Sequence, residues 1–219
     1  ESSGYAVEQA LEMANPLSED QRYLRMSLLP NLLWTLEKNK HLKQDLQLFE
    51  LSSVYHRKLF EILPEEAVSL QYEPFYLSGL VMGQQYSFDE AYGLVRAVLD
   101  SLSVRLQIPT VTYTQNSEKL QKMPSFKMFH PGRVGGVILD GENCIGLFGE
   151  AHPKVQEGLA LKQATFIFDV AFMPFIELAT LTKVYHPFSM FPETTEALSF
   201  ILNESQSVGE IVDTLRTLD

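Results

Sequence analysis

The 219-residue sequence predicts an α+β fold, with strands and amphipathic helices following one another along the chain. Two segments, 48–55 and 75–82, show the β-rich patterns typical of strands: the first alternates and the second is apolar on both faces. Two further apolar runs flank Asp140-Gly141-Glu142-Asn143, which is a hairpin signal and predicts an antiparallel pair. A Ser-x-x-Glu pattern at 87–90 and a Ser-Leu-Leu-Pro pattern at 27–30 predict the starts of helices.

The first of these helices is predicted over residues 27–40. Ser27 is expected to cap it, and Pro30 lies in the first turn, where its missing N–H costs nothing. Lysines near residue 40 suit the C-terminal end of a helix dipole. Apolar residues recur at helical spacing and form a leucine stripe with Trp34 at its margin. The stripe consists of Leu28, Leu29, Leu32, Leu33 and Leu36.

The remaining elements follow from local patterns of the same kind. Residue Gly79, inside the apolar strand, is expected where another group packs closely. Pro153 is expected at the first position of a short helix. The other predicted strands cover 110–114, 134–139, 144–148 and 165–170, and the other helices begin near 88 and 175.

A boundary is expected near residue 184, because the stretch 185–192 carries two prolines. A strand at 197–202 and a helix capped by Ser207 would follow. Since one strand and one helix cannot close a core, we expect the chain to stop inside its second domain. The expected division is 1–184 and 185–219.

Composition excludes several classes of protein. Asp and Glu total 28 against 17 Lys and Arg, a net charge of −11, which makes the chain a poor stand-alone binder of nucleic acid. No apolar run approaches the length needed to span a bilayer, and the first residues are not expected to form a signal peptide. The single cysteine, Cys144, excludes a disulfide framework and a cysteine-based zinc cluster. We expect a cytoplasmic protein.

Motifs of common enzymes are missing from the sequence. There is no Gly-x-Ser-x-Gly elbow, no phosphate-binding Gly-x-x-x-x-Gly-Lys loop and no Gly-x-Gly-x-x-Gly. The five histidines do not recur at the spacing that places two metal ligands on one helix face. We therefore predict neither a catalytic residue nor a metal site in this chain.

Two segments allow either a functional or a structural interpretation. In Phe129-His130-Pro131-Gly132-Arg133, a turn with a cation could hold a phosphate or carboxylate. Alternatively, Arg133 pairs with an acid and positions the hairpin. In Gly149-Glu150-Ala151-His152-Pro153, Glu150 and His152 could act as an acid/base pair, or they could cap the helix that follows. The structural interpretation is favoured in both cases.

These two segments and the first fifty residues resemble the beta subunit of bacterial phenylalanyl-tRNA synthetase. Five pieces occur in the order of that family and cover about 140 residues. They are Asn15-Pro16-Leu17-Ser18, Leu24 to Leu33 with Arg25 and Pro30, Leu48-Phe49-Glu50-Leu51, His130-Pro131-Gly132-Arg133 with Leu139-Asp140-Gly141, and Gly149-Glu150-Ala151-His152-Pro153.

The resemblance implies a class II synthetase-like module, an antiparallel sheet flanked by helices and without an active site. It implies that residues 27–40 form the helix of the dimer-interface motif and that 47–57 form the strand of the second class II motif. Arg57 stands alone at the end of that strand, and no later glycine-rich helix supplies a second arginine, so the site is expected to be silent. The tail from Tyr185 resembles the start of a ferredoxin-like anticodon-binding domain, although it lacks the family's Arg-Asp after the proline.

Three functions remain open at this stage. In the first, the chain is a structural module that docks on the alpha subunit through the leucine stripe and Trp34, within a heterotetramer of two alpha and two beta chains. That complex would use ATP, Mg²⁺ and tRNA(Phe), and the module itself would bind no cofactor. In the second, the chain is a stand-alone ATP-dependent carboxylate-activating enzyme. In the third, it binds RNA through Lys119, Lys122 and Lys127, with Phe126 and Phe129 available for stacking.

Overall fold

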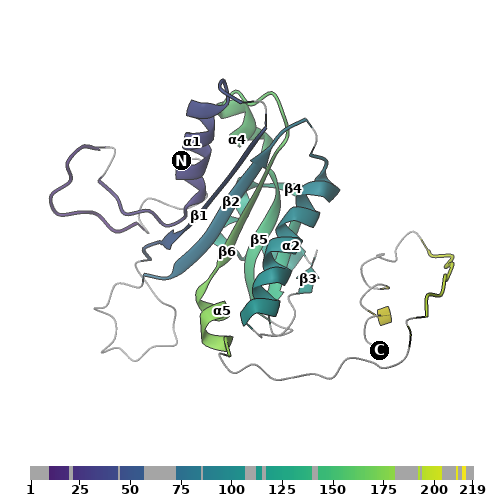
Figure 1. The fold of residues 1–219 in the computed structure, drawn as a ribbon. Coiled ribbons are helices and arrows are strands. Elements are labelled where there is room, and N and C mark those ends of the chain that lie inside the picture. Colours follow the sequence, from purple (N-terminus) through teal and green to yellow (C-terminus); the bar gives the residue numbers. More distant parts are fainter. Residues whose placement is uncertain are drawn as a thin grey trace. The chain divides into compact units, whose positions relative to one another are not determined.

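A six-stranded, fully antiparallel sheet forms the centre of the first of two units, Glu1–Lys183 and Val184–Asp219. The expected boundary at 184/185 differs from this division by one residue. The structure, a computed structural model, describes residues 10–19, 22–43, 45–56, 73–84, 86–106, 112–114, 117–139, 143–180, 192, 194–203, 211 and 214–215. The strands lie in the order β1-β2-β6-β5-β4-β3 (Figure 1).

The strands are those that the sequence patterns predict, with small differences in length. The predicted hairpin is confirmed, since β4 pairs antiparallel with β5, while its turn at 140–142 lies outside the described residues. The strands are β1 (Leu46–Ser53), β2 (Phe75–Met82), β3 (Thr112–Thr114), β4 (Phe129–Leu139), β5 (Asn143–Ala151) and β6 (Thr165–Ala171).

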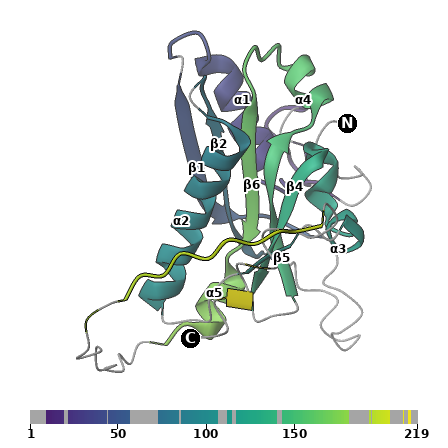
Figure 2. The ribbon, with the colours of Figure 1, turned by 90° about the vertical axis from the view of Figure 1, so that its right-hand side faces the viewer.

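Helices cover both faces of the sheet (Figures 1 and 2). On one face α1 (Leu29–Asn39) packs with the short elements α3 (Ser117–Gln121), η4 (Pro124–Met128) and α4 (Pro153–Gly158). On the other face α2 (Phe88–Leu106) and α5 (Met173–Leu178) pack over β4, β5 and β6. The described residues of the first unit therefore form two apolar cores, one on each side of the sheet.

The predicted capping signal is borne out at α2 and only in part at α1. At α2, Glu90 N donates to Ser87 Oγ at 3.3 Å and Ser87 N donates to Glu90 Oε2 at 2.7 Å, which is a complete capping box. These bonds hold the pKa of Glu90 below its usual value. At α1, Pro30 lies in the first turn as predicted, but the cap is Leu28, and Ser27 Oγ accepts from Leu29 N at 3.2 Å.

The close packing expected at Gly79 is also present. A Cβ on Gly79 would lie 2.5 Å from the ring of Phe168 and 2.8 Å from the carbonyl oxygen of Leu48. Strand β2 is therefore held close to both of its neighbours, β1 and β6.

Three predicted elements differ in the structure. The segment His130-Pro131-Gly132-Arg133 is an irregular part of β4, with a register shift between Phe129 and Val134, and not a turn before the strand. The stretch around Lys119 to Lys127, for which the sequence analysis names no element, forms α3 and η4. Residues 194–203 form no strand, because the described part of their unit supplies no second strand to pair with.

Candidate functional site

The leucine stripe of α1 is the main component of the core on its face of the sheet. Its five leucines are between 0% and 6% exposed and contact Leu80, Leu147 and Ile167 on the sheet's central strands through one apolar cluster. Side chains this deeply buried cannot reach another chain. The prediction that Leu28, Leu29, Leu32, Leu33 and Leu36 form a subunit interface is therefore wrong, because the chain's own sheet covers them.

Trp34 is on the outer side of the same helix. Its side chain is 56% exposed, and Lys38 places Nζ 3.4 Å from the centroid of the indole ring. A cation so close to an exposed indole is a stabilising contact worth on the order of 1 kcal/mol. Trp34 is thus the member of the predicted interface set that another molecule can reach.

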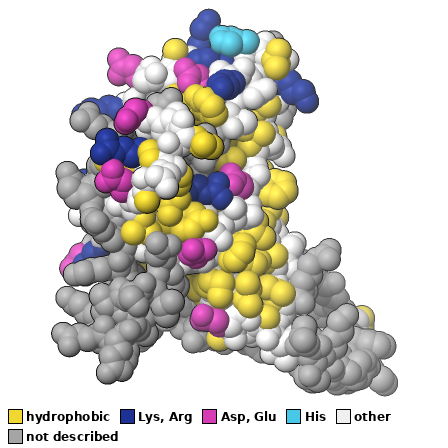
Figure 3. Space-filling view, turned by 90° about the vertical axis from the view of Figure 1, so that its left-hand side faces the viewer, with side chains coloured by type: hydrophobic (Ala, Val, Ile, Leu, Met, Phe, Trp, Pro, Cys, Tyr) yellow, Lys and Arg dark blue, Asp and Glu magenta, His cyan; other side chains and the backbone are white. Residues whose placement is uncertain are grey.

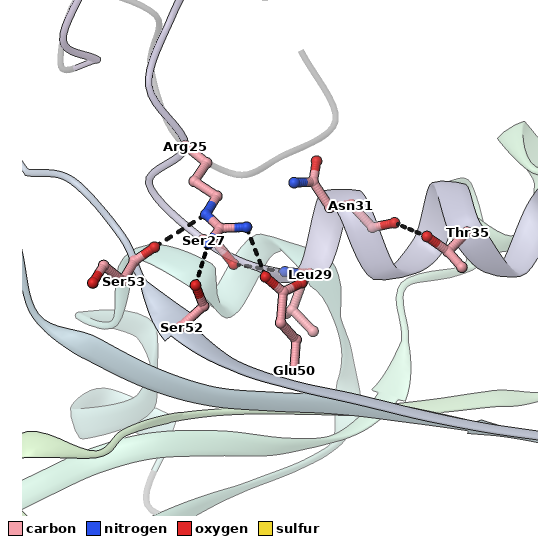
Figure 4. A network of polar contacts seen from close by, with 8 residues as sticks. All are labelled: Arg25, Ser27, Leu29, Asn31, Thr35, Glu50, Ser52 and Ser53. Atoms are coloured by element: carbon pink, nitrogen blue, oxygen red, sulfur yellow. Dashed lines mark hydrogen bonds and ion pairs between the residues drawn. The ribbon is translucent and has the colours of Figure 1, made fainter.

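The segment before α1 is tied to strand β1 by Arg25 (Figure 4). The guanidinium of Arg25 donates to Glu50 Oε1 at 2.7 Å, to Ser52 Oγ at 2.5 Å and to the carbonyl oxygen of Ser53 at 3.0 Å. Three acceptors on one strand use the planar fork of arginine fully. Arg25 and Glu50 therefore have a structural role in positioning α1.

A buried carboxylate, Asp169, joins four elements on the same face of the sheet. Ser78 on β2 donates to Asp169 Oδ1 at 2.5 Å, and the side chains of Ser125 and Ser27 also hydrogen-bond to this carboxylate. Burial raises the pKa of Asp169 to about 6, and the three serines act in the opposite direction. The sequence analysis missed this cluster. An aspartate inside the otherwise apolar run of β6 is the signal that could have found it.

The structural interpretation of the segments around Arg133 and Glu150 is correct. Arg133 on β4 forms an ion pair with Glu150 on β5, whose side chain is only 10% exposed, and Gln156 Nε2 donates to Glu150 Oε1 at 3.2 Å. His152 does not contact Glu150; its Nδ1 accepts from Lys154 N at 3.1 Å and so caps α4, where Pro153 follows. The two residues form no acid/base pair.

Neighbouring residues of these segments support the same hairpin. His130 Nδ1 accepts from Gly132 N at 3.0 Å, within the irregular segment that also contains Pro131. A Cβ on Gly149 would collide with the carbonyl oxygen of Arg133 and lie 2.8 Å from Val134 Cα. Glycine at 149 thus allows β4 and β5 to approach closely.

Only part of the predicted basic cluster is exposed among the described residues. Lys122 and Lys127 are exposed, while the side chain of Lys119 lies outside the described residues. Phe129 is 1% exposed in the core and Phe126 packs against that core. The prediction that Phe129 stacks on bases is therefore wrong, and Arg133 is engaged by Glu150.

The open side of β1 and β2 exposes apolar side chains that the sequence analysis did not single out as exposed. Phe49 is 77% exposed, Leu51 is 47% exposed and Phe75 is 44% exposed. Figure 3 shows hydrophobic side chains gathered on this side of the molecule. They are exposed because α2 and α5 pack over the other strands of this face.

The arrangement of the described residues is poorly suited to adenylation chemistry. Activation of a carboxylate by ATP needs cations facing the phosphates and the developing charge. Here the sheet face under α1 is filled by leucines, and Arg25 and Arg133 are both paired with carboxylates. Arg57 lies outside the described residues. In the part of the chain that the structure describes, no three His, Cys, Asp or Glu side chains gather as metal ligands.

Residues 3–172 match the family described as the phenylalanyl tRNA synthetase beta chain CLM domain. The chain belongs to this family. The resemblance stated above is thereby confirmed, and the leucines of α1, Arg25 and Arg133 all lie within the matched residues.

Individual relatives agree with the family. The phenylalanine–tRNA ligase beta subunit of Geobacter sulfurreducens is 30% identical over 212 residues, which is 91% of this chain and 24% of the relative. The same subunit of Bacillus subtilis is 26% identical over 98% of this chain and 26% of the relative. This chain thus spans about a quarter of the length of these relatives.

A solved structure supports the fold of the CLM domain. The pyrrolysyl-tRNA synthetase of Desulfitobacterium hafniense matches with a TM-score of 0.54 at 12% identity, over 77% of this chain and 52% of that one. At this identity the likeness shows the fold alone. It confirms the class II synthetase-like sheet, while the ferredoxin-like continuation stays a prediction. No helix among the described residues is long and apolar enough to cross a membrane.

Proposed function

We propose that this CLM domain is a catalytically silent module of a phenylalanine–tRNA ligase beta subunit. It assembles with the catalytic alpha subunit and supports aminoacylation of tRNA(Phe). The observation that carries the proposal is the filled sheet face: five leucines of α1 occupy the face, and Arg25 and Arg133 are paired with Glu50 and Glu150. A scaffold needs such a core, whereas an ATP site needs free cations.

The finer parts of the proposal come from the family resemblance. The complex contains two alpha and two beta chains and works in the cytoplasm. It uses ATP and Mg²⁺, and this module binds neither ATP nor Mg²⁺. Residues from 185 onward are the start of a ferredoxin-like anticodon-binding domain. This assignment agrees with the separate unit Val184–Asp219.

We place the contact with the alpha subunit on the outer face of α1. The buried leucines cannot contact the alpha subunit, but Trp34 is more than half exposed and lies on the same helix. Tryptophan is enriched among residues that dominate the binding energy of interfaces. Lys38 holds the indole in place, so little conformational entropy is lost when a partner covers it.

The test is co-expression of this chain with a bacterial phenylalanyl-tRNA synthetase alpha subunit. The native mass of the product is measured. The co-expressed product and the chain expressed alone are then each assayed for ATP–pyrophosphate exchange with phenylalanine. We expect a mixed complex that exchanges, and a lone chain that does not. Exchange by the lone chain would show that it is an enzyme in its own right.

The interface is tested by Trp34→Asp, with Ile176→Asp as the matched control. Ile176 is 51% exposed on α5, on the other side of the sheet. Trp34→Asp is expected to weaken the complex at least tenfold, and Ile176→Asp to leave its mass unchanged. If both folded variants assemble as well as the parent chain, α1 is not the docking surface.

A further inference from the structure

A pocket lies where the C-terminal end of α1 meets the turn between α4 and β6. Its volume is about 230 Å³, and Met82 and Gln163 form part of its wall. Four of its lining residues carry basic side chains: Lys40, His41, Lys43 and Lys162. Lys40, His41 and Lys43 follow the last residue of α1, while Lys162 is about 120 residues further along the chain.

The charge of this pocket is opposite to that of the chain. The whole protein carries a net charge of −11, yet none of the described residues that line the pocket is acidic. His41, Lys43 and Lys162 are exposed, so their side chains are accessible to solvent and to a ligand. Figure 3 shows Lys or Arg side chains and a histidine together at one end of the molecule.

Lys40 holds the two halves of this basic pocket together. Its ammonium donates to the carbonyl oxygen of Leu159 and lies 3.4 Å from that of Ala160. The N–H groups of the same turn are already used: Ala160 N donates to Glu157 O and Leu161 N to Gln156 O, both at 2.9 Å. The N–H groups of Ala160 and Leu161 are therefore not available to an anion, and we expect its attraction to depend mainly on the basic side chains.

We propose that the basic pocket binds the phosphodiester backbone of an RNA strand, an inference that rests on the proposed function. Lysines on flexible stems act as point charges and suit a backbone that passes over them. A site for free phosphate is more often built from arginine forks or backbone N–H groups; no arginine is among the described residues that line this pocket, and the N–H groups of Ala160 and Leu161 are already bonded.

The experiment measures binding of a labelled tRNA(Phe) transcript to the full chain at a series of salt concentrations. The pocket variant is Lys43→Glu with Lys162→Glu, which leaves the structural Lys40 in place. A single variant, Lys162→Glu, is compared with Lys154→Glu, an exposed lysine in the first turn of α4 that does not line the pocket. Inorganic phosphate at millimolar concentration is the competitor, and circular dichroism confirms that each variant folds.

We expect the double variant to bind tRNA at least tenfold more weakly at low salt. The slope of log K against log salt should fall by about 2, roughly 1 for each lost phosphate contact. Lys162→Glu should lose more affinity than Lys154→Glu, and inorganic phosphate should compete poorly. Equal losses at Lys162 and Lys154, or a loss only on reversal of Lys122 and Lys127, would overturn the proposal.

Two further outcomes would also overturn it. One is no measurable binding of tRNA by the parent chain at low salt; the other is release of tRNA by millimolar phosphate. Assembly with the alpha subunit is measured separately by native mass. If the chain forms the mixed complex but does not bind RNA, this inference alone is refuted. If the chain does not assemble with the alpha subunit, the proposed function is refuted.

Discussion

Ser78 Oγ donates a hydrogen bond of 2.5 Å to Asp169 Oδ1 across the neighbouring strands β2 and β6. Ser27, before α1, and Ser125, in η4, hydrogen-bond to the same carboxylate. One buried acid thus fixes the start of α1 and the η4 turn onto the sheet. A carboxylate in this position makes stability depend on pH.

The free energy of unfolding should therefore decrease as pH rises from about 4 to about 6. Burial raises the pKa of Asp169 from 3.8 to about 6 in the folded chain. A raised pKa means that the folded state binds the proton more tightly, so the contribution is complete below pH 3.8 and is lost as pH passes 6. The loss is roughly 3 kcal/mol, at about 1.4 kcal/mol per pKa unit.

The variant Asp169→Asn removes this titration and retains an oxygen acceptor for Ser78. Urea unfolding of both proteins at pH 4, 5, 6 and 7 measures the difference. The two curves should converge at low pH and separate at neutral pH, where the variant is relatively more stable. Parallel curves over this range would contradict a buried, titrating Asp169.

Leu36→Ala should destabilise the domain strongly, while Trp34→Ala should not. Leu36 is completely buried, and truncation of such a leucine costs about 2–5 kcal/mol because a cavity is left. Trp34 is 56% exposed, so its loss should cost about 1 kcal/mol or less, mainly the contact with Lys38. Thermal or urea unfolding checks both. A similar cost for the two variants would mean that α1 is not packed as described.

Ala160→Gly should stabilise the domain by roughly 1 kcal/mol. Ala160 has a φ of 48° at the end of α4, in the left-handed region, which costs a residue with a Cβ about 1–2 kcal/mol. Glycine relieves that strain, and its more flexible unfolded state offsets part of the gain. Ala151→Gly, at a buried strand position, is the control and should destabilise. A loss of stability in both variants would contradict the strain at Ala160.

Removal of Arg133 should cost about 1–2 kcal/mol, and Glu150→Gln should recover part of it. The side chain of Glu150 is 10% exposed and that of Arg133 is 57% exposed. Water therefore screens the charge of Arg133 much more than the charge of Glu150. In Arg133→Ala the carboxylate keeps Gln156 alone as its side-chain partner. A double-mutant cycle measured by urea unfolding gives the coupling energy. A coupling near zero would show that the ion pair does not hold the hairpin.

Local patterns predicted most elements of this fold because their causes are local. The capping box at Ser87 and Glu90, Pro153 at the start of α4, and the β4–β5 hairpin each depend on residues a few positions apart. The family resemblance came from ordered short motifs of the same kind. The sequence by itself thus determined the class of fold and the family.

Only the tertiary structure decided which side chains are available for function. The helical spacing of the leucines is the same whether another chain or the chain's own sheet covers them, so burial by β2, β5 and β6 could not be deduced from it. The pairing of Arg133 with Glu150 rather than with a ligand depends on the register of β4 and β5. Lys40 and Lys162 line the same pocket because α1 and the turn after α4 lie at one end of the sheet. Burial and charge are properties of neighbours in space, and for these residues the neighbours are far apart in sequence.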